Sequence, residues 1–321
     1  MPDLSVIVVT YRSADKLQPF LNATRGVAPH AEIVIVDNAS DDDTTQVARQ
    51  VDATARIVQC DVNVGFGRAC NLGASEARGG WLLFANPDLQ LRRLDLPSTT
   101  DADDGLWSGS IAMEGGDLVP SPGMRADTSL PEDYVDQVFS HLLPPSMSSR
   151  IPVRHRPPGW ASGALFLTSR ATFQRVGGFD PRYFLYYEDR DLGARYRALE
   201  IPIRPLEGLV GVHHQGTSSS NVSAGQREGW SLLSWLEYLG KWKGQQTANR
   251  AAKMAYRTFA PIASLSGQEK LPARLSSKAE RVAAVLHHLR TFEEQLPAGA
   301  DGYYPCARLA VEYAFPSDGW Q

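Results

Sequence analysis

Three carboxylates stand within four positions in the segment Glu188-Asp189-x-Asp191, which follows an aromatic run of Tyr183, Phe184, Tyr186 and Tyr187. A carboxylate among aromatic side chains loses hydration, so its pKa rises toward the range of a general base. The segment therefore predicts a proton-accepting site. The structural alternative is that Arg190 and Arg195 neutralise these carboxylates in ion pairs.

Two further clusters offer metal ligands. In Asn86-Pro87-Asp88, Asp88 supplies the one carboxylate, a hard oxygen ligand of the kind that Mg²⁺ and Mn²⁺ prefer. A turn with proline at its second position is the alternative interpretation. His213-His214 follows an apolar stretch and could add a nitrogen ligand from one of its two residues, since adjacent residues of a strand point to opposite faces.

Asp37 and the two glycines of Gly65-Phe66-Gly67 are candidates for binding a ligand. Asp37 ends a strand, where it could accept hydrogen bonds from a base or ribose or else cap the next helix. The glycines allow backbone to approach a phosphate, and Arg68 adds charge. Cys70 stands where the dinucleotide fingerprint needs its third glycine, which disfavours a Rossmann dehydrogenase.

Alternating strands and helices must position these residues. Continuous apolar runs predict buried strands at 4–9, 32–36, 57–58 and 81–85. Between them the sequence predicts three helices. The first two are capped by Ser13 and Ser40, and the third spans residues 65–78. This alternation predicts an α/β fold with a mostly parallel central sheet flanked by helices. Each strand ends in polar residues, so the site is expected at the carboxyl ends of the strands.

Composition narrows the classes of protein. The 321 residues carry 36 acidic and 32 basic side chains, a net charge of −4, which argues against nucleic acid as a partner. The three cysteines are far apart, and no signal peptide or long apolar segment is evident. These features predict a cytoplasmic protein.

Six motifs in order resemble the inverting nucleotide-sugar glycosyltransferases of family two, which have the GT-A fold. They cover about residues 4–220 and read VIVVTYRSADKL, IVIVDNASDDDT, NVGFGRACNLGA, LLFANPDLQL, GWASGALFLTSRATFQRVGGFDPRYFLYYEDRDLGARYR and VHHQGTS. The NPD, GWASGA and FDPRYFLYYEDRDL segments are most similar to bacterial, including actinobacterial, rhamnosyltransferases.

The resemblance implies a role for each matching residue. Asp189 takes the position of the catalytic base, with Glu188 beside it, while Asp88 and His213 would bind a divalent cation, Mg²⁺ or Mn²⁺. Asn86 replaces the first aspartate of the family's D-x-D motif, and its amide is a weaker metal ligand than a carboxylate. The implied acceptor-binding residues are Trp160, Ser162 and Gly163, and the implied nucleotide-binding residues are Thr10, Tyr11, Arg12, Asp37, Asn63, Gly65, Arg68, Asn71 and Asn86.

The resemblance predicts transfer of a sugar from a nucleotide diphosphate to an acceptor hydroxyl, with L-rhamnose from dTDP-rhamnose as the leading donor. The acceptor would be a glycan or a lipid-linked sugar in cell-wall or polysaccharide assembly. The alternatives are a transferase of the same family that uses a UDP-hexose and a soluble acceptor, and a catalytically silent nucleotide-sugar-binding protein.

The domain hypothesis assigns residues 1–222 to a catalytic domain, with a nucleotide-binding part at about 1–93 and an acceptor-binding part at about 94–222. Residues 223–321 form a mainly helical extension, with an apolar stripe through Trp235 and Trp242 and a second helix at 277–295. Basic residues near these tryptophans suit peripheral association with the inner face of the plasma membrane. Packing against the catalytic domain or a homodimer contact would explain the same stripe.

Overall fold

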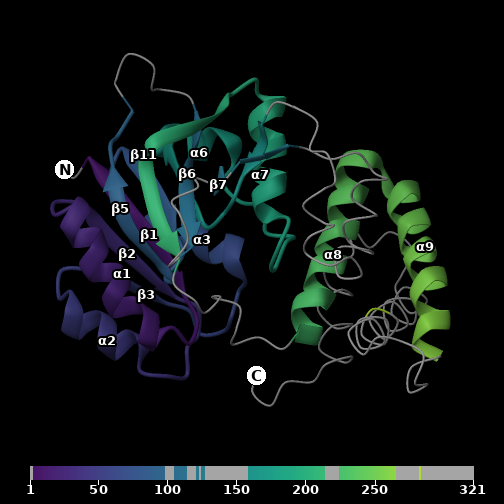
Figure 1. Ribbon diagram of the computed structural model, residues 1–321, viewed down its shortest axis with the longest axis horizontal. Coiled ribbons are helices and arrows are strands. Elements are labelled where there is room, and N and C mark those ends of the chain that lie inside the picture. The colour runs from purple at the N-terminus through teal and green to yellow at the C-terminus, as the bar shows by residue number, and fades with distance from the viewer. Residues whose placement is uncertain are drawn as a thin grey trace. The chain divides into compact units, whose positions relative to one another are not determined.

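The computed structural model describes residues 3–97, 105–113, 121–122, 124–126, 158–213, 224–264 and 282 (Figure 1). These residues divide between two compact units. One contains the described residues up to 184 and those from 188 to 213. The other contains Leu185–Tyr187 and the described residues from 224 onward.

The first unit is built on a mixed, mostly parallel sheet. Its described strands run in the order β3-β2-β1-β4-β10-β6-β11-β5, with β7 paired to β6. Only β10, β5 and β7 are antiparallel to their neighbours. The strands are β1 (Leu4–Thr10), β2 (Glu32–Asp37), β3 (Arg56–Gln59), β4 (Trp81–Ala85), β5 (Leu89–Leu94), β6 (Leu106–Met113), β7 (Ser121–Pro122), β10 (Leu165–Ser169) and β11 (Ile203–His213). Strands β8 (Met124–Ala126) and β9 (Pro158–Ala161) pair separately.

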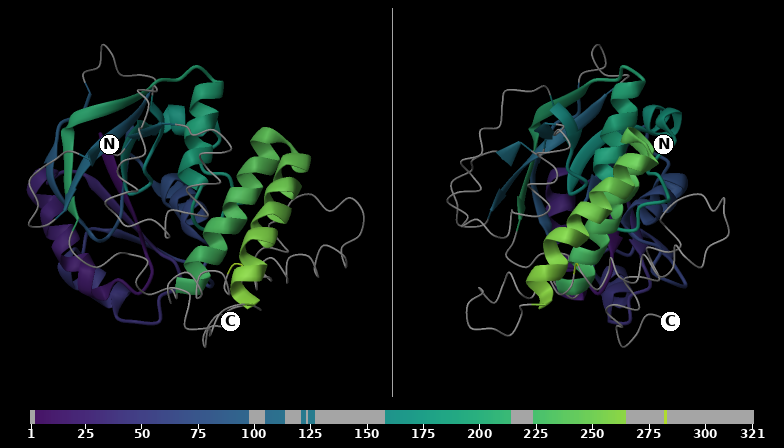
Figure 2. Two further views of the ribbon diagram at one scale, coloured as in Figure 1. Left: turned by 45° about the vertical axis from the view of Figure 1, so that its right-hand side comes forward. Right: turned by 90° about the vertical axis from the view of Figure 1, so that its right-hand side faces the viewer.

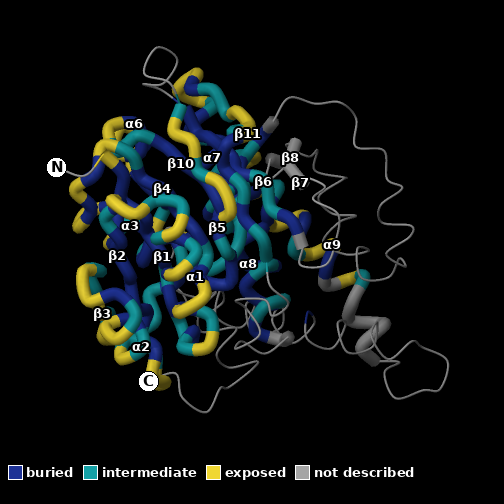
Figure 3. The backbone as a smooth tube through the Cα atoms, turned by 60° about the vertical axis from the view of Figure 1, so that its left-hand side comes forward, coloured by how far each residue is buried: buried dark blue, intermediate teal, exposed yellow. Residues whose placement is uncertain are grey.

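Helices cover both faces of this sheet, as predicted. On one face, α1 (Ala14–Val27) and α2 (Thr44–Val51) pack over β1 and β2, and Leu17, Phe20 and Leu21 are fully buried. On the other face lie α3 (Phe66–Glu76), α6 (Arg170–Val176) and α7 (Glu188–Ala198). Figure 3 shows the central strands as buried backbone between the two layers. This double coverage explains why the strands are continuous apolar runs in the sequence.

Two predicted helix starts differ in detail. Helix α2 begins at Thr44 with Asp43 at the capping position, so Ser40 does not cap it. The Ser40 hydroxyl instead accepts a hydrogen bond from the Arg12 amide, at 2.9 Å, and its own amide donates to Asp37. Ser13 does stand at the start of α1, but its side chain makes no capping bond. The Ser13 hydroxyl instead bonds the backbone of Tyr11, two residues away.

The second unit contains α8 (Ala224–Lys243) and α9 (Gln245–Ser264), which lie side by side in Figures 1 and 2. Gly244, at φ 88°, joins them in a conformation that other residues rarely adopt. The predicted apolar stripe is present: Trp235 is fully buried and Trp242 is half-buried. Among the helices that the structure describes, none is long and apolar enough to cross a membrane. The predicted helix at 277–295 lies outside the described residues, apart from Val282.

Candidate active site

The carboxyl ends of β1 and β2 bring Thr10 and Asp37 together. The Thr10 hydroxyl lies 3.3 Å from Asp37 Oδ1, and the Ser40 amide donates to Asp37 Oδ2. Both side chains are buried, and burial raises the pKa of Asp37 while the Ser40 and Thr10 bonds oppose that rise. Asp37 thus occupies the predicted position at the strand end with its carboxylate fixed by neighbours.

Asn38 is a residue of this region that the sequence prediction did not include. Its amide nitrogen donates to Asn63 Oδ1 at 2.9 Å, and its oxygen accepts from the Val64 amide at 2.8 Å. Asn63 Oδ1 also accepts from the Gly65 amide. The two asparagines therefore fix the loop before α3 to the end of β2. The feature of the sequence that could have identified Asn38 is its position directly after Asp37.

Gly65 lies close to another backbone segment. Its φ is 87°, and a Cβ atom there would be 2.4 Å from the carbonyl oxygen of Phe184. The Phe66 amide donates to the same carbonyl at 2.9 Å. A glycine is thus required here for packing against Phe184, whatever its predicted role near a phosphate.

The basic and amide residues predicted at the nucleotide have protein partners. Arg12 makes two bonds to the Asp41 carboxylate, at 2.6 and 2.7 Å, and its guanidinium lies 5.2 Å from the ring of the half-buried Tyr11. Arg68 donates to the carbonyl of Pro181 at 2.8 Å. Asn71 pairs with both backbone groups of Phe179, each at 2.8 Å. Their roles toward a nucleotide stay predictions.

The metal-ligand candidates meet at the end of the sheet where β5 and β11 pair. His213 lies opposite Leu89 in that pairing, and its Nε2 is 3.1 Å from Oδ2 of Asp88. The side chains are 17% and 2% exposed, respectively. His214 lies outside the described residues. Within the described part of the chain, no group of three or more histidine, cysteine or acidic residues gathers around a metal position.

Asp88 also lies in a proline turn, which was the alternative interpretation of Asn86-Pro87-Asp88. The Leu89 amide donates to the Asn86 carbonyl at 3.2 Å, so Asn86-Pro87-Asp88 forms a turn with proline at its second position. The Asn86 amide donates to the carbonyl of Ala164 at 3.0 Å. This bond connects the turn to the segment that precedes β10.

Asp189 lies in the first turn of α7, where the helix dipole favours a negative charge. Its Oδ2 accepts from the Gly163 amide at 3.0 Å, and its Oδ1 accepts from the Arg190 amide at 2.7 Å. Asp189 is half-buried, so it is accessible to a substrate hydroxyl. Because Gly163 adjoins Ala164, one short segment contacts both Asn86 and Asp189, and the two motifs lie close together.

Glu188 differs from Asp189 in its surroundings. It is 5% exposed, its Cβ lies close to Gly67 of α3, and its Oε2 has no hydrogen-bond partner among the described residues. Burial and the nearby Asp189 charge raise the pKa of Glu188 well above its ordinary value of 4.5. Glu188 is therefore buried and Asp189 is the more exposed of the two carboxylates, while the catalytic roles of both stay predictions.

The raised pKa of Glu188 has a consequence for stability. The folded protein retains a proton that the unfolded chain releases, so the free energy of unfolding decreases as the pH rises from about 4.5 toward the raised pKa. The isosteric Glu188→Gln variant carries no such proton. We expect its free energy of unfolding to fall less than that of the wild type between pH 5 and 8, measured by urea titration. Parallel pH dependences would contradict a protonated Glu188.

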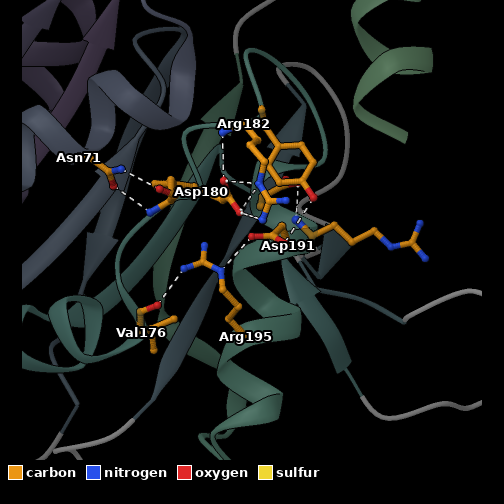
Figure 4. Close-up of polar contacts among 10 residues, drawn as sticks. Asn71, Val176, Asp180, Arg182, Asp191 and Arg195 are labelled. Carbon is orange, nitrogen blue, oxygen red and sulfur yellow. Dashed lines mark hydrogen bonds and ion pairs between the residues drawn. The ribbon is translucent and has the colours of Figure 1, made fainter. Parts of the chain in front are cut away.

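Asp191 has a structural role. Its side chain is fully buried, and Oδ2 is 2.9 Å from Nε of Arg195, which also donates to the carbonyl of Val176 at 2.8 Å. Figure 4 shows this pair beside the Asp180–Arg182 ion pair and the contacts of Asn71. The ion-pair alternative is thus confirmed for Asp191 with Arg195.

The predicted acceptor residues precede β10. Trp160 is half-buried, and Gly193 of α7 leaves room for it, since a Cβ at Gly193 would be 2.6 Å from Cβ of Trp160. Ser162 accepts from the Leu165 amide through its carbonyl, and Gly163 contacts Asp189. Gly163 thus contacts the start of α7 and Trp160 its middle, and the contacts of these residues with an acceptor stay predictions.

Comparison with known proteins identifies the fold and the protein family. A crystal structure of GalNAc-T7 with UDP, GalNAc and Mn²⁺ matches with a TM-score of 0.56 and 14% identity, over 88% of this chain and 54% of that chain. The fold is GT-A, as predicted. The model of Glycosyl transferase family 2 matches residues 5–104.

Curated relatives extend this match. The chain is 32% identical over 217 residues to N-acetylglucosaminyl-diphospho-decaprenol L-rhamnosyltransferase of Mycobacterium tuberculosis, covering 60% of this chain and 69% of the relative. It is 25% identical over 222 residues to the low-salt glycan biosynthesis hexosyltransferase Agl10 of Haloferax volcanii, covering 67% and 68%. The chain belongs to glycosyl transferase family 2 and is a glycosyltransferase.

Proposed function

We propose that the protein transfers L-rhamnose from dTDP-rhamnose to a hydroxyl of a polyprenyl-diphosphate-linked sugar, with inversion at the anomeric carbon. The observation that carries this proposal is the 32% identity to a mycobacterial enzyme whose name specifies rhamnose transfer to a decaprenol-linked sugar. A second candidate is transfer of another hexose, for which the similarity to the hexosyltransferase of Haloferax volcanii speaks.

In the proposed reaction Asp189 is the general base. Its carboxylate accepts the proton of the acceptor hydroxyl while that oxygen forms a bond to the anomeric carbon. The bond from the anomeric carbon to the diphosphate oxygen breaks at the same time, and the nucleoside diphosphate leaves. The Gly163 amide holds the carboxylate in place for this step.

Asp88 and His213 are the residues that would hold a divalent cation. Their carboxylate and imidazole groups suit Mg²⁺ or Mn²⁺, and the side chains of both residues are largely buried. Such a cation would stabilise the charge that develops on the leaving diphosphate. Thr10 and Asp37 would contact the nucleoside, and residues 1–222 would form the catalytic domain.

Peripheral binding to an anionic membrane is a further part of the proposal, and α9 supports it. This helix contains no acidic residue, and its Arg250, Lys253 and Arg257 are exposed. Trp230 and Trp235 of α8 are buried, so these tryptophans are not available to lipid. Sedimentation with phosphatidylglycerol vesicles at low salt tests this part, because the attraction rests on charge.

The donor is tested by thermal unfolding with different nucleotide sugars and Mn²⁺. Ligands that bind the folded state stabilise it by about 2.7 kcal/mol at a concentration 100 times the Kd. We expect dTDP-rhamnose to raise the Tm more than UDP-glucose or GDP-mannose at equal concentration. Asp37→Ala should lose this increase, whereas Asp15→Ala, in the first turn of α1, should keep it. A larger increase with UDP-glucose would favour the second candidate.

A further inference from the structure

The segment Leu185–Tyr187 connects Phe184 to the first residue of α7 in an unfavourable backbone conformation. Tyr186 and Tyr187 have φ values of 68° and 65°. Residues with a Cβ atom rarely adopt these values, and two in succession persist only where surrounding contacts hold them. The contacts of this segment therefore matter for where α7 begins.

Helix α8 provides such contacts from within the same compact unit. The Ser234 hydroxyl donates to the carbonyl of Leu185 at 2.8 Å. The ring of Tyr238 packs on that of Tyr187, with their centroids 5.7 Å apart. Ser234 and Tyr238 are four residues apart, so they share one face of the helix, and both are buried. One face of α8 thus holds the strained segment at both of its ends.

Tyr187 is joined directly to Glu188 and is two residues from Asp189. Any relaxation of the two tyrosines toward ordinary φ values would rotate the peptide that enters α7. The Gly163 and Arg190 amides donate to the two oxygens of the Asp189 carboxylate, so a rotation at the start of α7 would change these bonds. Misplacement of a catalytic group by about 1 Å can reduce a rate about 100-fold.

We infer that Ser234 and Tyr238 are positioning residues for the catalytic carboxylate, acting through the strained Leu185–Tyr187 segment. The inference rests on the proposed role of Asp189 as the base. It gives α8 a part in the reaction that does not require contact with either substrate.

The test compares variants of the full-length protein. We expect Ser234→Ala and Tyr238→Ala to lower kcat about tenfold or more, with an unchanged KM for the donor and an unchanged donor-induced rise in Tm. Tyr238→Phe keeps the ring and should recover most of the activity. Thr247→Ala is the matched control, since its hydroxyl bonds the Lys243 carbonyl within the α8–α9 hairpin, and it should keep the wild-type kcat.

A double-mutant cycle separates this inference from the proposed function. If α8 acts through Asp189, then Ser234→Ala should lower kcat little further in the Asp189→Asn background. Full additivity, or a loss of kcat that only follows loss of folded protein, would overturn the inference. Wild-type activity of Asp189→Asn alone would instead refute the proposed base, whatever the Ser234 variant does.

Discussion

Replacing Asp189 with asparagine should reduce kcat by about 10² to 10⁴, the usual contribution of a general base. The amide keeps the size of the side chain but cannot accept the proton of the acceptor hydroxyl. Asparagine still has one oxygen to accept from the Gly163 amide, so the start of α7 should remain in place. Steady-state transfer measured with saturating donor and acceptor checks the effect.

Asp191→Asn is the matched control on the same helix. It removes one charge from the buried pair with Arg195, so it should lower the free energy of unfolding by about 3 kcal/mol. At a temperature where both variants are folded, only Asp189→Asn should lose most of its turnover. Equal turnover of Asp189→Asn and the wild type, with nucleotide binding unchanged, would show that another group accepts the proton.

Removal of the divalent cation should have a comparably large effect. We expect excess chelator to abolish transfer by the wild type, and added Mn²⁺ or Mg²⁺ to restore it, because charge on the leaving diphosphate would lose several kcal/mol of stabilisation. Asp88→Asn should reduce turnover about 10² to 10³-fold at fixed Mn²⁺, in line with loss of one group that stabilises transition-state charge. The loss should be partly reversed by higher Mn²⁺.

Asp95→Asn controls for a change of charge close to the same strand, since Asp95 directly follows β5 and forms an exposed ion pair with Arg93. Exposed pairs contribute little to stability, so this variant should behave as the wild type. Full transfer in excess chelator would remove the metal role from Asp88 and His213. It would also fit the replacement of the first aspartate of the family motif by Asn86.

The sequence predicted the four strands β1 to β4 because the pattern that marks a strand is local. Strands β1, β2 and β4 are runs rich in β-branched and other apolar residues, and such a run indicates burial on both faces without reference to distant contacts. The strand ends at Asp37 and Asp88 follow from the same pattern. The GT-A fold and the family were confirmed by comparison, whereas the roles of the site residues stay predictions.

Contacts between distant segments account for what the sequence did not reveal. Asn71 uses both ends of its amide on the backbone of Phe179, 108 residues away, and no spacing within α3 indicates that partner. The role of Ser40 differs from the predicted helix cap for the same reason, because its hydroxyl accepts a hydrogen bond from the amide of the distant Arg12. The grouping of Leu185–Tyr187 with α8 also depends on a pairing 49 residues apart.

The reversed direction of β10 has a consequence for engineering this protein. Since β10 runs opposite to β4, Leu165 at its start lies beside Ala85 at the end of β4. Gly163 and Ala164, which directly precede β10, bond Asp189 and Asn86, so this strand pairing also fixes where those two contacts lie. We therefore expect an insertion between Ser162 and Leu165 to separate Asn86 from Asp189, whereas a substitution of Trp160 should leave their spacing intact.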